Sequence, residues 1–466
     1  MRRFLVWLAV GGLVALSGGS ASLAAQGFSV NEHSTCAMAR AGTGVASPCP
    51  DGSALFYNPA GLALMPRGKT TIAAGVTLIA PRGNFTSDVG VKTDLKDDVI
   101  PVPVFYLTHG FSDHVAAGVG LFAPYGLRTA WPATSEASFL GERSEIRALY
   151  LQPTLSAGFA DNRVLVGAGF DVNFLHVNLR QRIDLASTPL PPPAPAGAFF
   201  ANLGIPAGTA FADADLTGNG TGVGYHVGII IKPSDRVSLG VRYLSRQKVT
   251  IDGGKVNFSP VSTGITLAAG NPFGVPAGTS LDAVVAPQFA AGALLSDQDA
   301  KTALRMPEQW VFGVAVKPAT KLTLLADVQL QHWVVFDTLT IDFELAPTEI
   351  LPENFENTTA WRFGAEYQIT PRTAIRGGYL LHDGAEPKGS VTPNLPEGDR
   401  SEFTVGFGTR IGRKLGLDLA FQWIDQGDRR GRTVPYRNPF TNQINADNGL
   451  FEFHAPLFGA TISYDF

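Results

Sequence analysis

The chain has 466 residues, of which 45% are hydrophobic and only 16% charged, and its formal net charge at pH 7 is −4. This composition excludes a disordered chain, and the net charge gives no basis for a nucleic-acid partner. The length exceeds that of an ordinary single-core domain, but it suits one large β-barrel.

The first 25 residues predict a secretory signal peptide. A basic pair, Arg2 and Arg3, precedes an apolar stretch over residues 4–16, and small residues then offer a cleavage site before Gln26. The mature protein is therefore expected to leave the cytoplasm. Later uncharged runs are interrupted by Pro and Gly, so none of them predicts a membrane-spanning helix.

Residues 26–66 show no two-residue alternation and are rich in small residues and proline. This pattern predicts a compact plug instead of a strand. The segment contains the only two cysteines, Cys36 and Cys49. We expect them to form a disulfide because exported proteins fold in a compartment that permits one. Two unpaired structural cysteines are the alternative.

Residues 67–466 predict a barrel of about fourteen strands. Short turns alternate with long Pro- and Gly-rich loops, as in bacterial outer-membrane barrels, which have an even number of antiparallel strands. The expected strands are 69–80, 101–111, 115–124, 147–160, 163–184, 222–232, 236–257, 307–317, 321–343, 358–369, 372–383, 400–411, 414–425 and 450–466.

Alternation along these segments predicts which side chains face lipid. Trp361, Phe363 and Tyr367 share one face of their strand, whereas Arg362 and Glu366 share the other, which is expected to face the lumen. The last strand alternates in the same way and ends on an aromatic residue, Phe466. A soluble β-sandwich is the alternative, but the signal peptide and the terminal Phe favour the membrane.

Several motifs then occur in a fixed order along the chain. The run from Ser53 to Leu62 contains Asn58-Pro59-Ala60, and further motifs occupy 118–127, 306–313, 326–333, 361–367, 376–379 and 396–400. In this order, between a signal peptide and fourteen strands, they resemble the FadL/TodX family of outer-membrane transporters for long-chain fatty acids and hydrocarbons. The resemblance covers about Gly27 to Phe466. The cysteine pair and the proline-rich stretch 189–195 depart from it.

The resemblance implies an all-β fold: a fourteen-stranded antiparallel transmembrane barrel in the outer membrane of a Gram-negative-type bacterium. It divides the chain into a signal peptide (1–25), a hatch (26–66) that includes Asn58, Pro59 and Ala60, and the barrel (67–466). It implies passive uptake of hydrophobic molecules, foremost long-chain fatty acids, with aromatic or other hydrocarbons as the alternative. A general porin and an outer-membrane lipase are weaker alternatives.

The expected partners are the hydrophobic small molecule, outer-membrane lipid and the barrel assembly machinery, and the protein is expected to be a monomer. No cofactor or metal ion is expected. The sequence lacks the Cys-x-x-Cys, His-Glu-x-x-His and Gly-x-Ser-x-Gly spacings of common metal and nucleophile sites, so an enzyme is not predicted.

The implied uptake route assigns roles to particular residues. Two loops are unusually apolar for water-facing segments, and their side chains are candidates for capture: Phe199, Phe200, Leu203, Phe289 and Leu294. Alternatively, these loops pack together as a lid. Three inward arginines, Arg242, Arg362 and Arg376, are candidates for binding a carboxylate, or else they form an ion-pair ladder that braces the barrel.

The implied exit is a side opening at a kinked third strand. Gly118 and Gly120 weaken the strand over 115–124, and Pro124 follows them. Glycine and proline within strands mark bends, bulges or missing ladder bonds, so these three residues are candidates for the opening. The alternative is an ordinary strand end before Pro124.

Overall fold

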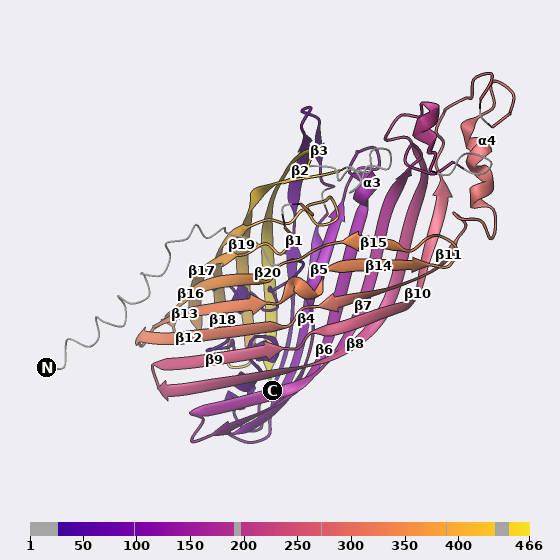
Figure 1. The fold of residues 1–466 in the computed structure, drawn as a ribbon. Helices are drawn as coiled ribbons and strands as arrows, with labels where there is room; N and C mark the ends of the chain where they lie inside the picture. Colours follow the sequence, from indigo (N-terminus) through magenta and orange to yellow (C-terminus); the bar gives the residue numbers. More distant parts are fainter. Residues whose placement is uncertain (1–26, 97, 191–196, 272, 388, 434–446) are drawn as a thin grey trace.

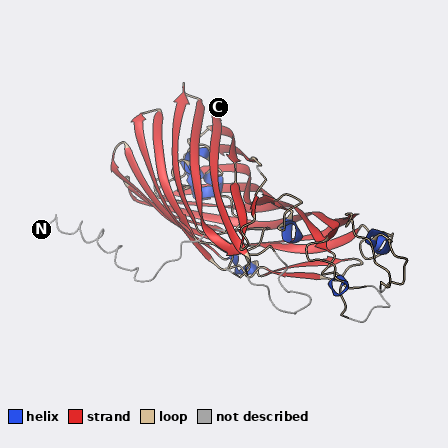
Figure 2. Cartoon of the chain, turned by 90° about the horizontal axis from the view of Figure 1, so that it is seen from above, coloured by secondary structure: helices blue, strands red, loops and turns tan. Residues whose placement is uncertain are grey.

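The computed structural model describes residues 27–96, 98–190, 197–271, 273–387, 389–433 and 447–466, so the predicted signal peptide lies outside the described residues. The strands wrap into a tilted tube, and several of them extend well past the others at one end (Figure 1). Short helices lie inside the tube and at that extended end (Figure 2).

Twenty strands form one continuous sheet. The first ten are β1 (Thr70–Ile79), β2 (Arg82–Ser87), β3 (Lys92–Asp94), β4 (Ile100–Gly110), β5 (Val115–Ala130), β6 (Arg143–Phe159), β7 (Val164–Asp184), β8 (Ala210–Ser234), β9 (Val237–Leu244) and β10 (Gln247–Pro260). The others are β11 (Gln298–Met306), β12 (Gln309–Ala319), β13 (Leu322–Gln331), β14 (Thr338–Phe343), β15 (Glu349–Pro352), β16 (Thr358–Thr370), β17 (Thr373–His382), β18 (Arg400–Ile411), β19 (Leu415–Gly431) and β20 (Gly449–Asp465).

The short helices belong to two regions. Those near the N-terminus are α1 (Thr35–Met38), α2 (Ala54–Tyr57) and the 3₁₀ helix η1 (Pro59–Leu64). Those in the loops are α3 (Ser138–Gly141), η2 (Phe200–Leu203), α4 (Leu281–Val285), η3 (Ala286–Phe289) and η4 (Trp333–Val335). Within the described residues, no helix combines the length and the hydropathy that a membrane crossing requires.

The sheet closes into an antiparallel barrel with fourteen strand positions, which confirms the predicted fold class. The last strand β20 pairs with the first strand β1, from Asp465 opposite Thr71 to Leu457 opposite Ile79. Four positions are each filled by two consecutive strands, namely β9 with β10, β11 with β12, β13 with β14, and β15 with β16. Strands β2 and β3 form a side extension on β20.

The interruptions within these four positions were not predicted. Ser245-Arg246 interrupts one strand, and Pro307-Glu308 interrupts its neighbour at the same level, because Leu244 pairs with Gln309 and Gln247 with Met306. Proline cannot donate a ladder hydrogen bond, so a break at Pro307 is expected once the strand is known to pass through it. The prediction began this strand at 307 and therefore missed β11.

Other predicted strands are too short, β8 most of all. Strand β8 begins at Ala210 instead of 222, and β5 continues through Pro124 to Ala130 instead of ending there. Both extensions pair with neighbouring strands along their length, so the sheet ladder overrides the glycines and the proline that suggested loops.

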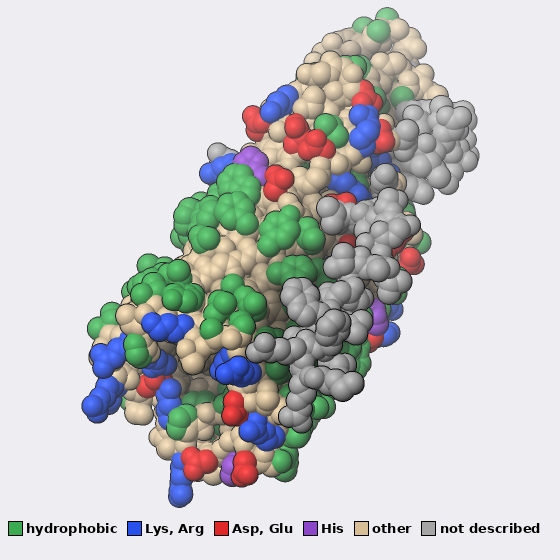
Figure 3. Space-filling model, turned by 90° about the vertical axis from the view of Figure 1, so that its left-hand side faces the viewer, with side chains coloured by type: hydrophobic (Ala, Val, Ile, Leu, Met, Phe, Trp, Pro, Cys, Tyr) green, Lys and Arg blue, Asp and Glu red, His purple; other side chains and the backbone are tan. Residues whose placement is uncertain are grey.

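The predicted lipid-facing and lumen-facing sides are confirmed. Trp361 and Phe363 are 49% and 47% exposed on the outer face, whereas Arg362 between them is 2% exposed. Exposed apolar side chains form patches over the barrel wall (Figure 3). The last strand follows the same rule, with Phe458 and Ile462 exposed and Thr461 buried.

Candidate functional site

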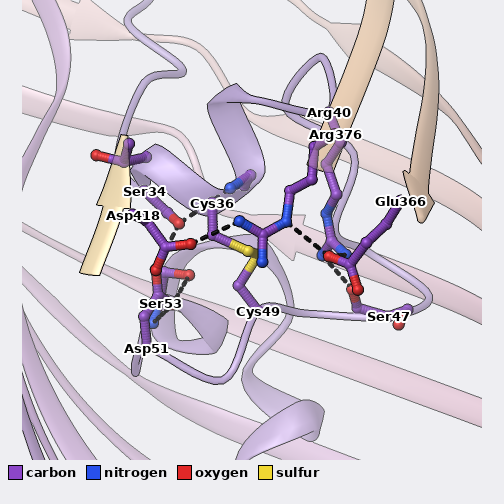
Figure 4. Close-up of a disulfide and its surroundings, with 12 residues drawn as sticks. Ser34, Cys36, Arg40, Ser47, Cys49, Asp51, Ser53, Glu366, Arg376 and Asp418 are labelled. Atoms are coloured by element: carbon purple, nitrogen blue, oxygen red, sulfur yellow. Dashed lines mark hydrogen bonds and ion pairs between the residues drawn. A yellow bond between two sulfur atoms is a disulfide. The ribbon is translucent and has the colours of Figure 1, made fainter. Parts of the chain in front are cut away.

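The segment from Gly27 to Pro66, here called the hatch, lies inside the barrel and is bonded to its wall. Thr35 Oγ1 lies 2.7 Å from Thr461 Oγ1 of β20, and the Ala41 amide donates to Thr404 Oγ1 of β18 at 3.0 Å. Cys36 and Cys49 form a disulfide that joins two parts of the hatch (Figure 4). The hatch is thus a crosslinked plug attached to several strands.

Asn58 connects the hatch to the barrel wall. Its side-chain oxygen accepts a bond from the Ala60 amide at 3.1 Å and so caps η1. Its amide nitrogen donates to the carbonyls of Val45 at 2.7 Å and Ile229 of β8 at 3.1 Å. Pro59 follows at the first position of η1, where a missing N–H costs nothing. One side chain therefore fixes the helix start, a hatch loop and a strand.

Glycines on eight strands let the hatch approach the wall closely. A Cβ atom at any of them would meet hatch atoms at contact distance or closer: Gly167, Gly228, Gly240, Gly313, Gly364, Gly378, Gly406 and Gly459. At Gly228 of β8 the added atom would overlap Asn58 Oδ1 and lie 2.7 Å from Pro59 Cδ. We call this ring of residues the glycine belt. Because side chains are missing there, hatch backbone fills the lumen up to the wall.

The three arginines predicted to bind a carboxylate all lie around the hatch. Arg242 is 4.3 Å from the centre of the Phe56 ring, and its Nη1 donates to Gln309 at 2.9 Å. Arg362 donates to Gln329 and lies beside Gly42 of the hatch.

Arg376, the third arginine, lies between the carboxylates of Glu366 and Asp418, at 2.7 Å and 2.5 Å. Arg40 of the hatch approaches Glu366 at 3.7 Å, so the hatch joins this ladder (Figure 4). Arg376 thus has the bracing arrangement that was the alternative expectation.

A cavity of about 840 Å³ lies above the hatch, toward the long loops. Its walls come from the start of the hatch and from β4, β5, β6, β7, β18, β19 and β20. Leu127 and Leu457 give it an apolar surface inside the barrel, and it reaches Leu149 and Phe174 on the outer face of the wall. None of the three predicted arginines is among its lining residues. This size and lining are typical of a site for a small hydrophobic molecule with a few polar contacts.

Arg400 is the lining cation that sequence reasoning missed. It begins β18, and its Nε donates to Gln426 Oε1 at 3.4 Å. In the described part of the chain no carboxylate lies within ion-pair distance of it, whereas the lining residue Arg147 is held by Glu145 at 2.8 Å. Arg400 ends the motif 396–400 and begins a predicted strand, and these were the available signals. Arg400 can therefore accept an anionic group inside the cavity.

The barrel wall is incomplete beside this cavity. Strand β4 pairs with β5 only from Gly110 to Phe105, whereas it pairs with β1 over its whole length to Ile100. Two prolines, Pro101 and Pro103, lie on the stretch of β4 that has no β5 partner. Proline has no N–H to donate to a neighbouring strand. The nitrogens of Pro101 and Pro103 point toward β5, so this edge of β4 offers no N–H donor there. The wall thus has an opening between β4 and β5.

The predicted kink differs in detail from the structure. Gly118 and Gly120 pair regularly with Thr108 and Tyr106, below the opening. The bend lies higher, where the register with β6 shifts between Phe122 and Tyr125 across Pro124. The two glycines instead make room for neighbouring side chains; a Cβ at Gly118 would lie 2.7 Å from Thr108 Cγ2.

The hatch occupies the free edge of β5 at this opening. The Val30 amide donates to the Pro124 carbonyl at 3.0 Å, and the Gly126 amide donates to the Phe28 carbonyl at 2.9 Å. Ser29 and Tyr125 form an antiparallel bridge between these bonds. The start of the hatch therefore fills part of the place that β4 leaves, and it also lines the cavity. Hatch position and wall opening are physically coupled.

The loop between β17 and β18 lines another side of the cavity through Leu395, Pro396 and Glu397. Glu397 accepts bonds from the amides of Ala385 and Glu386 and from the hatch residue Gly27. Burial raises the pKa of Glu386 well above its ordinary value, and the charge of Glu353, on the loop between β15 and β16, raises it further. Burial likewise raises the pKa of Glu353 to about 7. The interaction between the carboxyl groups of Glu353 and Glu386 therefore depends on pH near neutrality.

The five predicted capture residues lie away from the cavity, on the extended ends of β7, β8, β10 and β11. Phe200 is fully buried there with Phe211, Leu281 and Leu295 in a separate apolar cluster. Phe199, Leu203 and Phe289 are partly buried, and Leu294 is 45% exposed. The two loops pack against each other, which is the lid arrangement given as the alternative. Some apolar side chains, including Leu294, remain exposed on the outer surface of this cluster.

One buried arrangement has the hydrogen-bond order of a hydrolase triad. Asp171 Oδ1 lies 2.7 Å from His226 Nδ1, and His226 Nε2 lies 2.8 Å from Thr154 Oγ1. All three side chains are at most 5% exposed, and none lines the cavity. A nucleophile needs access to a substrate carbonyl, so this geometry supports structural bonding, not hydrolysis.

The family model for outer membrane protein transport proteins (OMPP1/FadL/TodX) matches residues 16–466. The long-chain fatty acid transport protein of Escherichia coli K12 is 23% identical, and the match covers 94% of each chain.

Solved structures that share the fold include a FadL homologue and a toluene transporter. A FadL homologue of Pseudomonas aeruginosa is 20% identical, with a TM-score of 0.75, and the match covers 94% of this chain and 99% of that one. The toluene transporter TodX of Pseudomonas putida is 17% identical, with a TM-score of 0.63, and the match covers 95% and 98%.

Proposed function

Because the chain belongs to the OMPP1/FadL/TodX family of outer-membrane proteins that transport hydrophobic compounds, we propose that it takes up long-chain fatty acids by passive diffusion. The observation that carries this proposal is the adjacency of the apolar cavity, with Arg400 in its wall, to the opening between β4 and β5. A fatty acid needs both an apolar volume for its chain and a cation or donors for its carboxylate.

Uptake begins at the long loops. The exposed margin of the loop cluster, including Leu294 and part of Phe289, gives an amphiphile an apolar surface outside the membrane. The ligand then enters the cavity, where its carboxylate binds Arg400 and its chain lies against Leu127 and Leu457. An ion pair is stronger inside a protein cavity than in bulk water.

Release is sideways, into the membrane. At the glycine belt the hatch lies directly against the wall, so a direct path to the periplasm would require the hatch to move. Withdrawal of Phe28, Ser29 and Val30 from the β5 edge frees the opening next to Pro101 and Pro103. An acyl chain leaving there passes from an apolar cavity into lipid tails, which needs no energy source.

The test compares hexadecanoate with hexadecanol, which has the same chain length and no charge. Replacing Arg400 with Gln removes a charge-assisted hydrogen bond, worth about 1.5–3 kcal/mol. We expect hexadecanoate affinity in nanodiscs to fall by roughly 10- to 150-fold, with hexadecanol affinity unchanged. Arg147→Gln is the matched control, because Arg147 also lines the cavity but is paired with Glu145.

Equal loss for both ligands would show a packing effect and remove the head-group role of Arg400. Equal binding of both ligands by the wild type, unaffected by Arg400→Gln, would favour the second candidate, a transporter of neutral hydrocarbons. The apolar cavity lining and the fold shared with the toluene transporter TodX support that candidate.

A further inference from the structure

The periplasmic end of the barrel carries a concentration of positive charge that uptake does not use. This end, here called the rim, comprises the short turns and strand ends at 65–69, 111–114, 160–163, 232–236, 317–321, 370–373, 410–414 and 465–466. It holds eleven Lys and Arg residues but four Asp, a net charge of +7. The whole chain has a net charge of −4, so the remaining residues carry −11.

Most rim cations have no carboxylate partner. Arg163 pairs with Asp235, and Lys69 and Arg410 both pair with Asp465. Among the described residues, no ion pair is formed by the other eight, namely Arg67, Lys232, Arg236, Lys317, Lys321, Arg372, Arg413 and Lys414. Like charges held together without counter-ions favour an anionic partner.

Backbone bonds between successive turns place these cations next to one another around the rim. The Lys232 amide donates to the Arg163 carbonyl at 2.8 Å, and the Lys317 amide donates to the Arg236 carbonyl at 2.8 Å. The Arg410 amide donates in the same way to the Arg372 carbonyl at 2.9 Å. The charge therefore follows the circumference instead of forming a patch on one side.

The rim cations adjoin the lipid-facing surface. Ile231, next to Lys232, is 45% exposed, and Ile411, next to Arg410, is 55% exposed on the outer wall. Lys and Arg side chains gather at the lower end of the molecule in Figure 3, below the hydrophobic side chains of the wall. Cations at this boundary lie at the depth of the phospholipid head groups.

We propose that the rim binds the phosphate groups of anionic phospholipids in the inner leaflet of the outer membrane. A circular distribution next to exposed apolar side chains fits a ring of lipids, whereas a docked protein would contact one side. Each Lys or Arg near an anionic membrane surface contributes favourably, and Arg can bond a phosphate through two N–H groups. The partner is thus a lipid such as phosphatidylglycerol, selected over zwitterionic lipids of the same chain length.

The experiment measures lipid retention by native mass spectrometry of the full-length protein in mixed micelles. Phosphatidylglycerol and phosphatidylcholine with identical acyl chains compete at equal concentration. We expect the wild type to retain phosphatidylglycerol about fivefold or more in excess, an advantage that falls with added salt. Replacing the four neighbouring cations Lys232, Arg236, Lys317 and Lys321 with Gln should reduce the preference by at least about half.

A charge-conserving variant with Lys232→Arg, Arg236→Lys, Lys317→Arg and Lys321→Arg is the matched control, and it should keep the wild-type preference. Heat-dependent gel migration checks that both variants form barrels. An unchanged preference in the Gln variant, or equal loss in both variants, would overturn the proposal. Displacement of the lipid by inorganic phosphate at the same concentration, or retention of an acidic protein in place of the lipid, would also overturn it.

Discussion

Replacing Gly228 with Ala should loosen the hatch. The added Cβ would lie 2.7 Å from Pro59 Cδ and overlap Asn58 Oδ1. Ordinary carbon contacts need about 3.5 Å, so this part of the hatch must move by roughly 0.8 Å or more. Such a shift strains or breaks the Asn58 bonds to Ile229 at 3.1 Å and Val241 at 3.3 Å.

The energetic cost follows from overpacking and lost hydrogen bonds. Overpacking costs about 1–3 kcal/mol, and each strained bond contributes up to about 1 kcal/mol. A net cost of about 2–3 kcal/mol would raise the population of a displaced hatch by roughly 30- to 150-fold.

The assay is single-channel conductance in planar bilayers, together with swelling of liposomes in small sugars. Gly228→Ala should produce short conducting openings far more often than the wild type. The control is Gly253→Ala, because a Cβ at Gly253 meets no atom within 4 Å. If both variants conduct like the wild type, the hatch is not held closed by contact at the glycine belt.

Two other perturbations test the wall opening and the loop beside the cavity. Replacing Pro101 and Pro103 with Val restores two N–H donors on the free edge of β4; two added ladder bonds of about 1 kcal/mol each should favour a closed wall by roughly 30-fold. Fatty-acid uptake by cells should slow while binding by purified protein persists, and unchanged uptake would count against a lateral exit. For Glu353, the folded pKa of about 7 exceeds the ordinary Glu value, so its stabilising effect is complete at low pH and disappears as pH rises through 7. Hydrogen exchange in loop 383–399, corrected for intrinsic rates, should therefore be several-fold faster at pH 8 than at pH 5.5. Glu353→Gln should reduce that difference and leave the part due to Glu386; an undiminished difference in the variant would exclude Glu353 as a cause.

The sequence was sufficient for the barrel and for the direction of its side chains. Alternation identifies Arg362 and Asp327 as inward and Trp361 as outward, because a strand has only two faces. It does not give the height at which an inward side chain lies or what occupies the lumen there. The sequence therefore predicts that Arg242 and Arg362 point into the barrel. It does not predict whether they contact the hatch or line the cavity.

The opening in the wall was only partly predictable. The register of β5 with β6 shifts across Pro124, but the missing β4 partner depends on two prolines in a segment that otherwise looks like an ordinary strand. Pro101 and Pro103 are two residues apart, so their nitrogens face the same edge of the strand and leave it without N–H donors. This spacing is visible in the sequence and could have indicated an unpaired edge. Arg400 could not be identified from its neighbours, because its role depends on the cavity formed by distant strands.

The bonds between the hatch and the last strands have a consequence for the order of folding. Thr35 and its partner Thr461 are separated by 426 positions, and Ala41 and Thr404 by 363. The hatch is synthesised first, yet its binding surface exists only once the final strands have formed and the wall has closed. Contacts this distant in sequence form late and slowly. The plug should therefore dock as the concluding step of biogenesis, and a newly closed barrel should pass through a brief unplugged stage that conducts small solutes.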